Sequence, residues 1–158
     1  MIYGKWLRGS DDLSQALALR QEVFVQEQGF SAEAEHDKLD DRAVHALLFD
    51  DEGRTVGCGR LYIDDEGYWH LGRLCVRKEQ RGKQLGDLLM RMMLDKAMMA
   101  GGKHFRLGAQ ADKRGFYEKY GFTAVGDPYL DEGVEHYLME ADDQSVLRAV
   151  FSGCKSQA

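Results

Sequence analysis

The stretch that decides the fold is LCVRKEQRGKQLGDLLM, residues 74–90. Its pattern predicts a buried strand, a short basic loop with two glycines, and the first turns of an amphipathic helix. The first backbone N–H groups of a helix lack intrahelical partners, and the helix dipole adds partial positive charge there. The loop carries four cations against one acid: Arg77, Lys78, Arg81 and Lys83 against Glu79. A phosphate or pyrophosphate site is one interpretation; an ordinary basic strand-to-helix turn is the other.

The composition limits the classes of function. The chain has 158 residues, enough for one domain, and a formal net charge of −6 with a pI near 5.4. This balance argues against broad nucleic-acid or membrane-surface binding, so an anionic ligand must be held by local groups. The three cysteines form no CxxC pair and the five histidines are scattered, so we expect no metal site. Because the cysteines are odd in number and the chain is too large to depend on disulfides, a cytoplasmic location is expected. No apolar run approaches the length of a membrane span, and the start lacks a signal-like apolar region.

The first third of the chain predicts a strand, a helix and a loop. A strand is expected over residues 2–7, and a helix follows the N-cap candidates at residues 10–12 and continues to about Gln26. The helical period is then lost over residues 28–42, where acids gather. This segment is expected to be an exposed loop that either lines a site or is simply a solvated charge run. His45, just inside the next strand, is expected to be a satisfied histidine at the edge of the core.

The middle of the chain predicts a meander followed by a crossover. Strands are expected over residues 43–49, 55–63 and 68–76, joined by short acidic turns that contain glycine. Gly57-Cys58-Gly59 is not a dinucleotide fingerprint, because no helix follows it. The helix that starts after the basic loop should end at Gly101-Gly102. Because a helix crossover precedes it, the strand over residues 103–109 is expected to pair in parallel with the strand over 68–76.

The last third predicts a short aromatic helix and two strands. The helix contains Phe116, Tyr117 and Tyr120, and strands are expected over residues 122–125 and 134–140. Pro128, the sole proline, is placed in a turn between them. From residue 141 onward the chain could add a helical turn or two.

This order of elements resembles the GNAT superfamily of acyl-CoA-dependent N-acyltransferases. Four segments are similar to its ElaA-like branch: residues 19–28 (LRQEVFVQEQ), 108–111 (GAQA), 116–122 (FYEKYGF) and 133–136 (GVEH). The resemblance implies an α/β (α+β) fold with a mixed, mostly antiparallel sheet, a central parallel strand pair and flanking helices. It also implies a single GNAT-like acyltransferase domain over residues 1–142, followed by a C-terminal tail over 143–158 with a short helix.

The resemblance also implies the residues that hold acetyl-CoA, the acyl donor. Residues 81–86 resemble the loop that wraps the coenzyme A pyrophosphate, but Gln84 stands where the family has its central glycine. The strand before this loop would have a bulge, and a backbone N–H at or near Leu74 or Cys75 would hold the thioester carbonyl. The implied binding set is Leu74, Cys75, Val76, Arg81, Gly82, Lys83, Gln84, Leu85, Gly86, Asp87, Gln110, Phe116 and Tyr117. No histidine lies at an evident partnering position for Cys75, so an acyl-enzyme route is not expected.

Tyr117 resembles the family's general acid, which protonates the departing coenzyme A thiolate; packing against the coenzyme is the alternative. The general base is expected among Glu27, Asp37 and His136. Glu27 is the first choice, and its alternative role is to fix the end of the first helix to the acidic loop. The function implied is acetyl transfer from acetyl-CoA to a primary amine by direct attack in a ternary complex.

Two other functions fit the same residues: a non-catalytic acyl-CoA-binding or sensing module, and a structural domain that binds no coenzyme. The acceptor would be a small-molecule or peptide amine, and the acidic residues 33–41 favour a cationic one. No nucleic-acid or membrane partner and no metal is expected, and a homodimer is left open.

Overall fold

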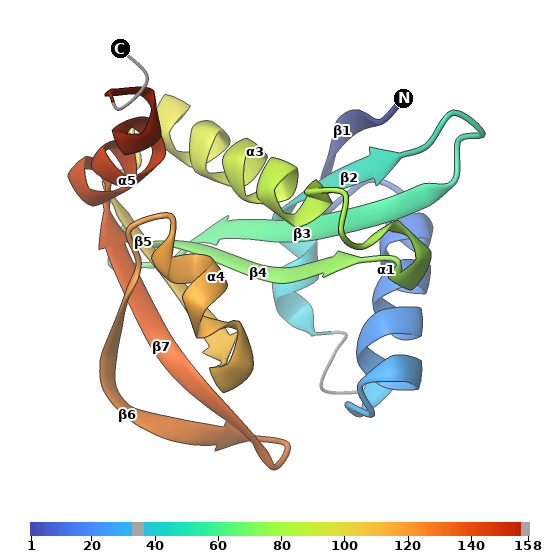
Figure 1. The fold of residues 1–158 in the computed structure, drawn as a ribbon. Helices are drawn as coiled ribbons and strands as arrows, with labels where there is room; N and C mark the ends of the chain where they lie inside the picture. Colours follow the sequence, from blue (N-terminus) through green and yellow to red (C-terminus); the bar gives the residue numbers. More distant parts are fainter. Residues whose placement is uncertain (33–36, 156–158) are drawn as a thin grey trace. The chain divides into compact units, whose positions relative to one another are not determined.

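A computed structural model describes residues 1–32 and 37–155, with side chains to residue 150 (Figure 1). Seven strands hydrogen bond in the order β1-β2-β3-β4-β5-β7-β6, and all neighbouring pairs whose register is known are antiparallel except β4 with β5. The strands are β1 (Tyr3–Arg8), β2 (Val44–Phe49), β3 (Thr55–Ile63), β4 (Trp69–Val76), β5 (His104–Gln110), β6 (Thr123–Asp131) and β7 (Val134–Asp142). The α-helices are α1 (Ser14–Arg20), α3 (Leu85–Met99), α4 (Arg114–Glu118) and α5 (Asp143–Lys155). This mixed α/β architecture is the fold class predicted from the sequence.

The chain divides into two compact units. The first contains residues 1–63 and 71–97, and the second contains residues 64–70 and the chain from residue 98 onward. None of the helices within residues 1–32 and 37–155 has the length and apolar character needed to cross a membrane.

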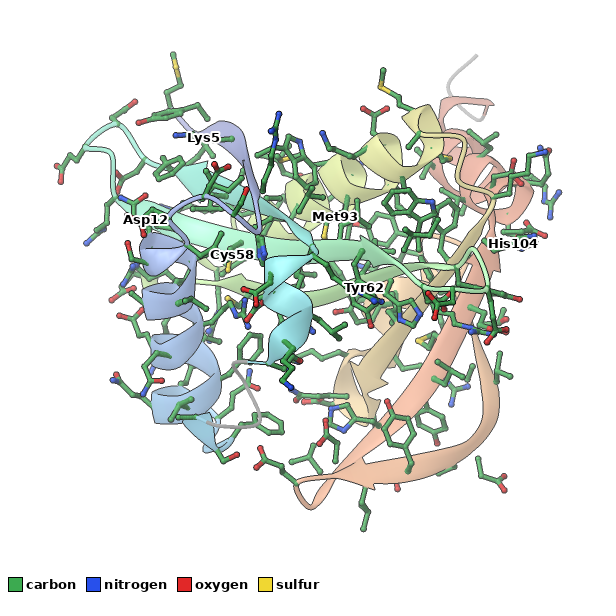
Figure 2. The ribbon with its side chains drawn as sticks, turned by 180° about the vertical axis from the view of Figure 1, so that it is seen from behind. Lys5, Asp12, Cys58, Tyr62, Met93 and His104 are labelled. Carbon is green, nitrogen blue, oxygen red and sulfur yellow. The ribbon has the colours of Figure 1, made fainter. Side chains whose placement is uncertain are left out.

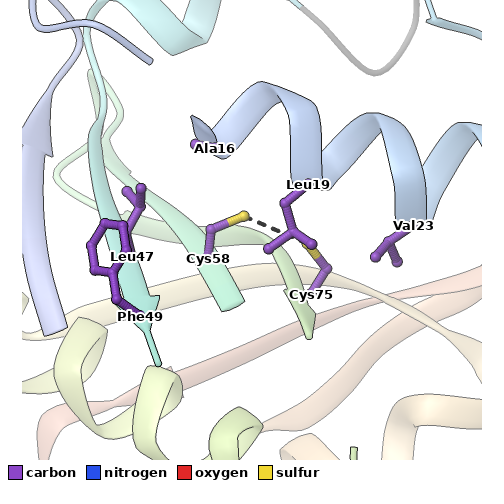
Figure 3. Packing of buried hydrophobic residues seen from close by; sticks show 7 residues of the cluster. All are labelled: Ala16, Leu19, Val23, Leu47, Phe49, Cys58 and Cys75. Atoms are coloured by element: carbon purple, nitrogen blue, oxygen red, sulfur yellow. Dashed lines mark hydrogen bonds between the residues drawn. The ribbon is translucent and has the colours of Figure 1, made fainter. Parts of the chain in front are cut away.

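In the first unit, α1 and α3 cover opposite faces of the strands. Figure 3 shows one face, where helical residues meet side chains of β2, β3 and β4; the buried residues there are Ala16, Leu19, Val23, Leu47, Phe49, Cys58 and Cys75. Successive side chains of a strand alternate between faces. Gly57 and Gly59 therefore face the other way, toward Leu89 and Met93 of α3.

The Gly57-Cys58-Gly59 pattern is explained by this packing. A Cβ atom at Gly59 would lie 2.8 Å from the Met93 sulfur, and one at Gly57 would lie 3.1 Å from Leu89. Figure 2 labels Met93 and Cys58. The two glycines let α3 approach the strands closely, while Cys58 fills the opposite face.

In the second unit, β5, β7 and β6 form an antiparallel group with one buried face. Its core contains Phe105, Leu107 and Ala109 from β5 and Met139 and Ala141 from β7. The same face carries Tyr137, whose ring lies 4.8 Å from the Arg114 guanidinium of α4. Residues of alternate parity, which include Gln110 and His136, therefore lie on the face opposite α4.

Several expectations about the elements need correction. The first helix is α-helical only to Arg20 and continues as a π-helix, η1 (Gln21–Glu27). The N-cap is Leu13 and not one of the candidates at residues 10–12; Asp12, labelled in Figure 2, lies one residue earlier and accepts a hydrogen bond from the Ser14 N–H at 3.0 Å.

The expected turn at Pro128 is wrong. Pro128 lies within β6, at an irregularity between Val125 and Tyr129 where the register against β7 shifts. A bulge tolerates proline because the regular ladder is interrupted there. Consequently β6 extends to Asp131. The tail forms the 13-residue helix α5, whose Val146 is buried, in place of a turn or two.

Candidate functional site

The basic loop has backbone features that suit an anion. After the 3₁₀ turn η3 (Lys78–Gln80), Gly82 has φ +83° and Gln84 has φ +63°. Space is open around Gly82, where an added Cβ would meet no atom within 4 Å. The first i-to-i−4 bond of α3 runs from the Leu88 N–H to the Gln84 carbonyl at 3.1 Å. The N–H groups that precede this bond point out of the start of α3, where helices commonly bind anions.

Gln84 has the backbone conformation that a glycine would adopt. Its positive φ lies in the left-handed region, which costs most side-chain-bearing residues about 1–2 kcal/mol. Gln84 stands where the family has a glycine, and its backbone keeps the glycine-like conformation despite the side chain. The loop therefore retains the backbone shape while storing local strain.

Two cations of the loop are bound to carboxylates of η1. Arg77 donates to both oxygens of Glu22, at 2.7 and 2.8 Å, and also to the Thr55 carbonyl. Arg81 forms a two-point pair with Glu27, with one bond at 2.9 Å, and its Nε donates to the Val76 carbonyl. Glu27 raises the pKa of Arg81. The net positive charge of this loop is therefore smaller than its sequence alone suggests.

This pairing places Glu27, the first choice for a general base, against the loop. Both of its oxygens accept from Arg81, so the carboxylate connects the end of η1 to the basic loop. The alternative role expected for Glu27 was to fix the helix end to the acidic loop; the observed partner is the basic loop instead. Its role as a base stays a prediction.

Asp37 and Asp40 do not belong to a solvated charge run. Asp40 is fully buried and accepts from Arg20 at 2.7 and 3.1 Å and from Arg60 at 3.1 Å. Asp37 accepts from Arg60 at 2.6 Å and from Arg73 at 3.3 Å. We call these five residues the arginine–aspartate cluster. The expectation of an exposed loop is wrong for Asp40, which lies on the 3₁₀ helix η2 (Lys38–Asp41). Glu33 and Glu35 lie outside the described residues.

Two titratable groups in or beside the cluster, Asp40 and His45, have lowered pKa values. Burial would raise the pKa of Asp40, but the hydrogen bonds and charges of Arg20 and Arg60 hold it below its usual value. His45 is buried, its Nε2 donates to the Asp40 carbonyl at 3.0 Å, and burial lowers its pKa. The prediction of a satisfied core histidine is confirmed.

β4 departs from regular strand geometry next to the proposed thioester position. Arg73 has φ +49° and directly precedes Leu74 and Cys75. This is where the resemblance implies a bulge. The Cys75 thiol is buried and lies 3.5 Å from the Cys58 thiol. These contacts give Cys75 the surroundings of a packed core residue.

In the second unit, Tyr117 lies on α4 beside Phe116, with an edge-to-face ring contact at 5.1 Å between centroids. Burial raises the pKa of the Tyr117 phenol to about 12. α4 ends at Glu118, and the turn after it contains Gly121, whose φ is +93°. The phenol is therefore neutral over the physiological range and available as a hydrogen-bond donor.

Gln110 and His136 are brought together on the face opposite α4. They are direct partners in the β5–β7 ladder, and His136 is only 7% exposed. The His136 Nδ1 lies 2.8 Å from the Val134 carbonyl. A carbonyl can only accept, so Nδ1 carries the proton and Nε2 is the basic nitrogen of the neutral ring.

Sequence reasoning missed Tyr129, whose ring stacks on His136 with centroids 5.7 Å apart. The signal that could have found it is the pairing of a long β6 with β7, which the placement of Pro128 in a turn concealed. Within residues 1–32 and 37–155, the structure gathers no group of three or more His, Cys, Asp or Glu side chains suited to a metal ion.

Comparisons with known proteins agree with this geometry. Residues 11–142 match the family model described as an acetyltransferase (GNAT) domain. The uncharacterized N-acetyltransferase YjcF of Bacillus subtilis is 35% identical over 136 residues, which cover 85% of this chain and 96% of the relative.

Two solved structures are also similar. An acyl-CoA N-acyltransferase from Pseudomonas aeruginosa has a TM-score of 0.81 and 31% identity, and ElaA of Escherichia coli has a TM-score of 0.80 and 29% identity. Each similarity covers 89% of this chain and 99% of the other.

Proposed function

Because this chain belongs to the GNAT acetyltransferase family, we propose that it transfers an acetyl group from acetyl-CoA to a primary amine by direct attack in a ternary complex. The observation that carries the proposal is the loop over residues 81–87. Gly82 and Gln84 both have positive φ values, and they lead into the start of α3, where the Leu88 N–H makes the first i-to-i−4 bond. That backbone suits the diphosphate of coenzyme A.

Binding of the donor is assigned mainly to the backbone in this proposal. Arg77 and Arg81 are already paired with glutamates, so N–H groups of residues 82–87 carry most of the interaction with the diphosphate. Lys83, whose ammonium donates to the uncharged Gln80 side chain at 3.1 Å, adds charge. Gln110 and Phe116 are proposed to contact the pantetheine arm.

The acetyl carbonyl is proposed to accept a hydrogen bond from a backbone N–H at Leu74 or Cys75. The irregular backbone at Arg73 supports this position, since it interrupts the strand immediately before it. The amine nitrogen attacks the thioester carbon, the oxygen gains charge that this N–H stabilises, and the carbon–sulfur bond breaks. Cys75 takes no covalent part.

Tyr117 is proposed to donate a hydrogen bond to the departing thiolate. With a phenol pKa of about 12 and a thiol pKa of about 8.5, complete proton transfer would be uphill by roughly 5 kcal/mol. Donation without full transfer is therefore the better description of its role in this environment. The thiolate can leave as the anion and take its proton from solvent.

His136 is proposed as the base that removes a proton from the attacking amine. The Nε2 of His136 is the basic nitrogen. His136 lies on the face of β5 and β7 opposite α4, the helix that carries Tyr117. The hydrogen-bond donor and the base thus belong to opposite faces of the same strands. Glu27 remains the competing candidate, with anchoring of Arg81 as its other role.

The acceptor class is a primary amine on a small molecule or a peptide. Asp37 and Asp40 do not favour a cationic acceptor, because arginines neutralise both. A cytoplasmic location is proposed from the cysteine pattern. The domain division at residue 142 and the homodimer stay predictions.

The alternative function is a non-catalytic acyl-CoA-binding or sensing module. In the sequence, Gln84 at a glycine position favoured the sensing module. Because the Gln84 backbone is glycine-like, the substitution is a weaker reason to expect a non-catalytic protein. Thiol release from acetyl-CoA across a broad amine panel, with product masses, separates the two functions. Acetylated product supports the enzyme. Tight acetyl-CoA binding without transfer to any amine or to components of a cell extract supports the sensor.

The choice of base is tested by a matched pair of amide variants. His136→Gln should remove the acidic limb of the pH–rate profile, because the group that must be deprotonated is lost. Glu27→Gln should keep that limb and weaken acetyl-CoA binding through the loop. The reverse pattern would assign the base to Glu27.

A further inference from the structure

The feature that the proposed function leaves unused is the ring of Tyr129, which crosses three strands. Tyr129 on β6 is the direct ladder partner of His136 on β7, so their side chains share a face. Their rings stack at 5.7 Å between centroids with an interplanar angle of 27°. One face of the His136 imidazole is therefore covered by Tyr129.

Gly108 on β5 makes room for the far end of this ring. A Cβ atom at Gly108 would lie 2.6 Å from the Tyr129 hydroxyl oxygen. Such an approach is closer than any side chain permits, so residue 108 must lack a Cβ if Tyr129 is to keep this position. The ring thus reaches from β6, over β7, to β5.

The bulge in β6 places Tyr129 at this point. The register between β6 and β7 shifts between Val125 and Tyr129, across Gly126, whose φ is +76°, and Pro128. Val125 pairs with Leu138 and Tyr129 pairs with His136, so the bulge shifts the register by two residues and keeps Tyr129 on the face that His136 shares. Without the shift Asp127 would pair with His136, so the bulge determines that Tyr129 is the residue opposite it.

The two contacts on His136 restrict different motions. The Nδ1–H bond to the Val134 carbonyl selects the tautomer. The Tyr129 ring blocks the volume through which the imidazole would have to turn about its Cβ–Cγ bond, a rotation that would take Nδ1 away from the Val134 carbonyl. Burial, and secondarily the charge of Asp131, raises the pKa of Tyr129 and keeps its hydroxyl protonated.

We propose that Tyr129 is a positioning residue that holds the His136 imidazole with Nε2 directed at the acceptor amine, and that Gly108 is required for it to do so. This inference rests on the proposed function, because it gives His136 the role of base. The ring, rather than the hydroxyl, supplies the restraint.

The test begins with histidine nitrogen spectra, which require no substrate. Long-range ¹H–¹⁵N correlation spectra distinguish the two neutral tautomers, and His136→Gln assigns the signal among the five histidines. We expect one Nδ1–H tautomer for His136 in the wild type and in Tyr129→Phe. A mixture of tautomers is expected in Tyr129→Ala and in Gly108→Ala, which displaces the ring without altering it.

The second measurement is kcat with an amine that the wild type acetylates. Tyr129→Ala should lower kcat about tenfold or more with the KM for acetyl-CoA unchanged, since misplacing a base costs rate and not donor binding. Tyr129→Phe should stay within about threefold of wild type. The matched control is Tyr3→Ala, which removes another half-exposed, stacked tyrosine (Tyr3 stacks on Phe49) in the first unit and should change neither readout.

Each outcome decides the proposal. A single unchanged tautomer in folded Tyr129→Ala and Gly108→Ala overturns it, and so does a tautomer mixture that leaves kcat unchanged. If the wild type acetylates no amine, the proposed function fails, while the spectra still show whether Tyr129 positions the imidazole.

Discussion

The substitution Asp40→Asn tests whether the arginine–aspartate cluster stabilises the first unit. Asp40 is fully buried, and Arg20, its partner at 2.7 Å, is only 1% exposed. Arg60 keeps Asp37 at 2.6 Å after the substitution, whereas Arg20 loses the charge of Asp40. Removing one partner of a buried ion pair costs about 3–5 kcal/mol. At roughly 2–4 °C per kcal/mol for a chain of this length, Tm should fall by about 6–20 °C.

The assay is urea and thermal unfolding, with Asp51→Asn as the matched control. Asp51 pairs with the N-terminal amine at the surface, where an ion pair contributes at most about 1 kcal/mol. The pKa of Asp40 is held below its unfolded value, so its contribution is present above about pH 4 and is lost as the pH falls through the folded pKa. Asp40→Asn should lose that part of the acid dependence. A destabilisation below about 1 kcal/mol would refute the reasoning.

Three further predictions concern the loop, the acid and a core histidine. Gln84→Gly should raise the free energy of unfolding by up to about 1 kcal/mol by relieving the left-handed strain, whereas Gln84→Ala, which keeps the Cβ, should give no gain in urea unfolding. Tyr117→Phe should lower kcat about 100-fold, because the departing thiolate loses a hydrogen-bond donor, with an unchanged Kd for acetyl-CoA by calorimetry, and unchanged turnover would remove Tyr117 from the mechanism. Burial lowers the pKa of His45, so its contribution to stability is present above about pH 6.5 and declines as the pH falls toward the folded pKa; the pH dependence of Tm should lose this decline in His45→Gln.

The sequence predicted the elements whose signals are local. The hairpin turns carry their own acidic and glycine residues, and β3 (Thr55–Ile63) has the bounds expected from them. The parallel pairing of β4 with β5 followed from the helix crossover between them, and it is confirmed at Trp69 with Phe105. Local chemistry was sufficient for these features.

The features that the sequence missed depend on contacts between distant residues. Asp40 looked solvated because its partners Arg20 and Arg60 lie 20 residues away on either side. The pairing of Glu27 with Arg81 spans 54 residues. No local pattern reports whether an acid in a charged stretch faces water or a buried guanidinium.

The site over β6 was missed for a different reason. Proline usually marks a turn or a strand edge, so Pro128 appeared to end the strand. The bulge instead carries β6 past the proline and brings Tyr129 opposite His136. A change of register of this kind becomes visible only when the partner strand is known.

The most direct test of the central claim is an amide NMR titration of the loop over residues 81–87. Acetyl-CoA should shift the N–H signals of Gly82, Gly86 and Asp87, because its diphosphate binds these groups. Acetyl-pantetheine, which lacks the diphosphate, should leave them unchanged. Saturable acetyl-CoA binding with no change at these three amides would contradict the account.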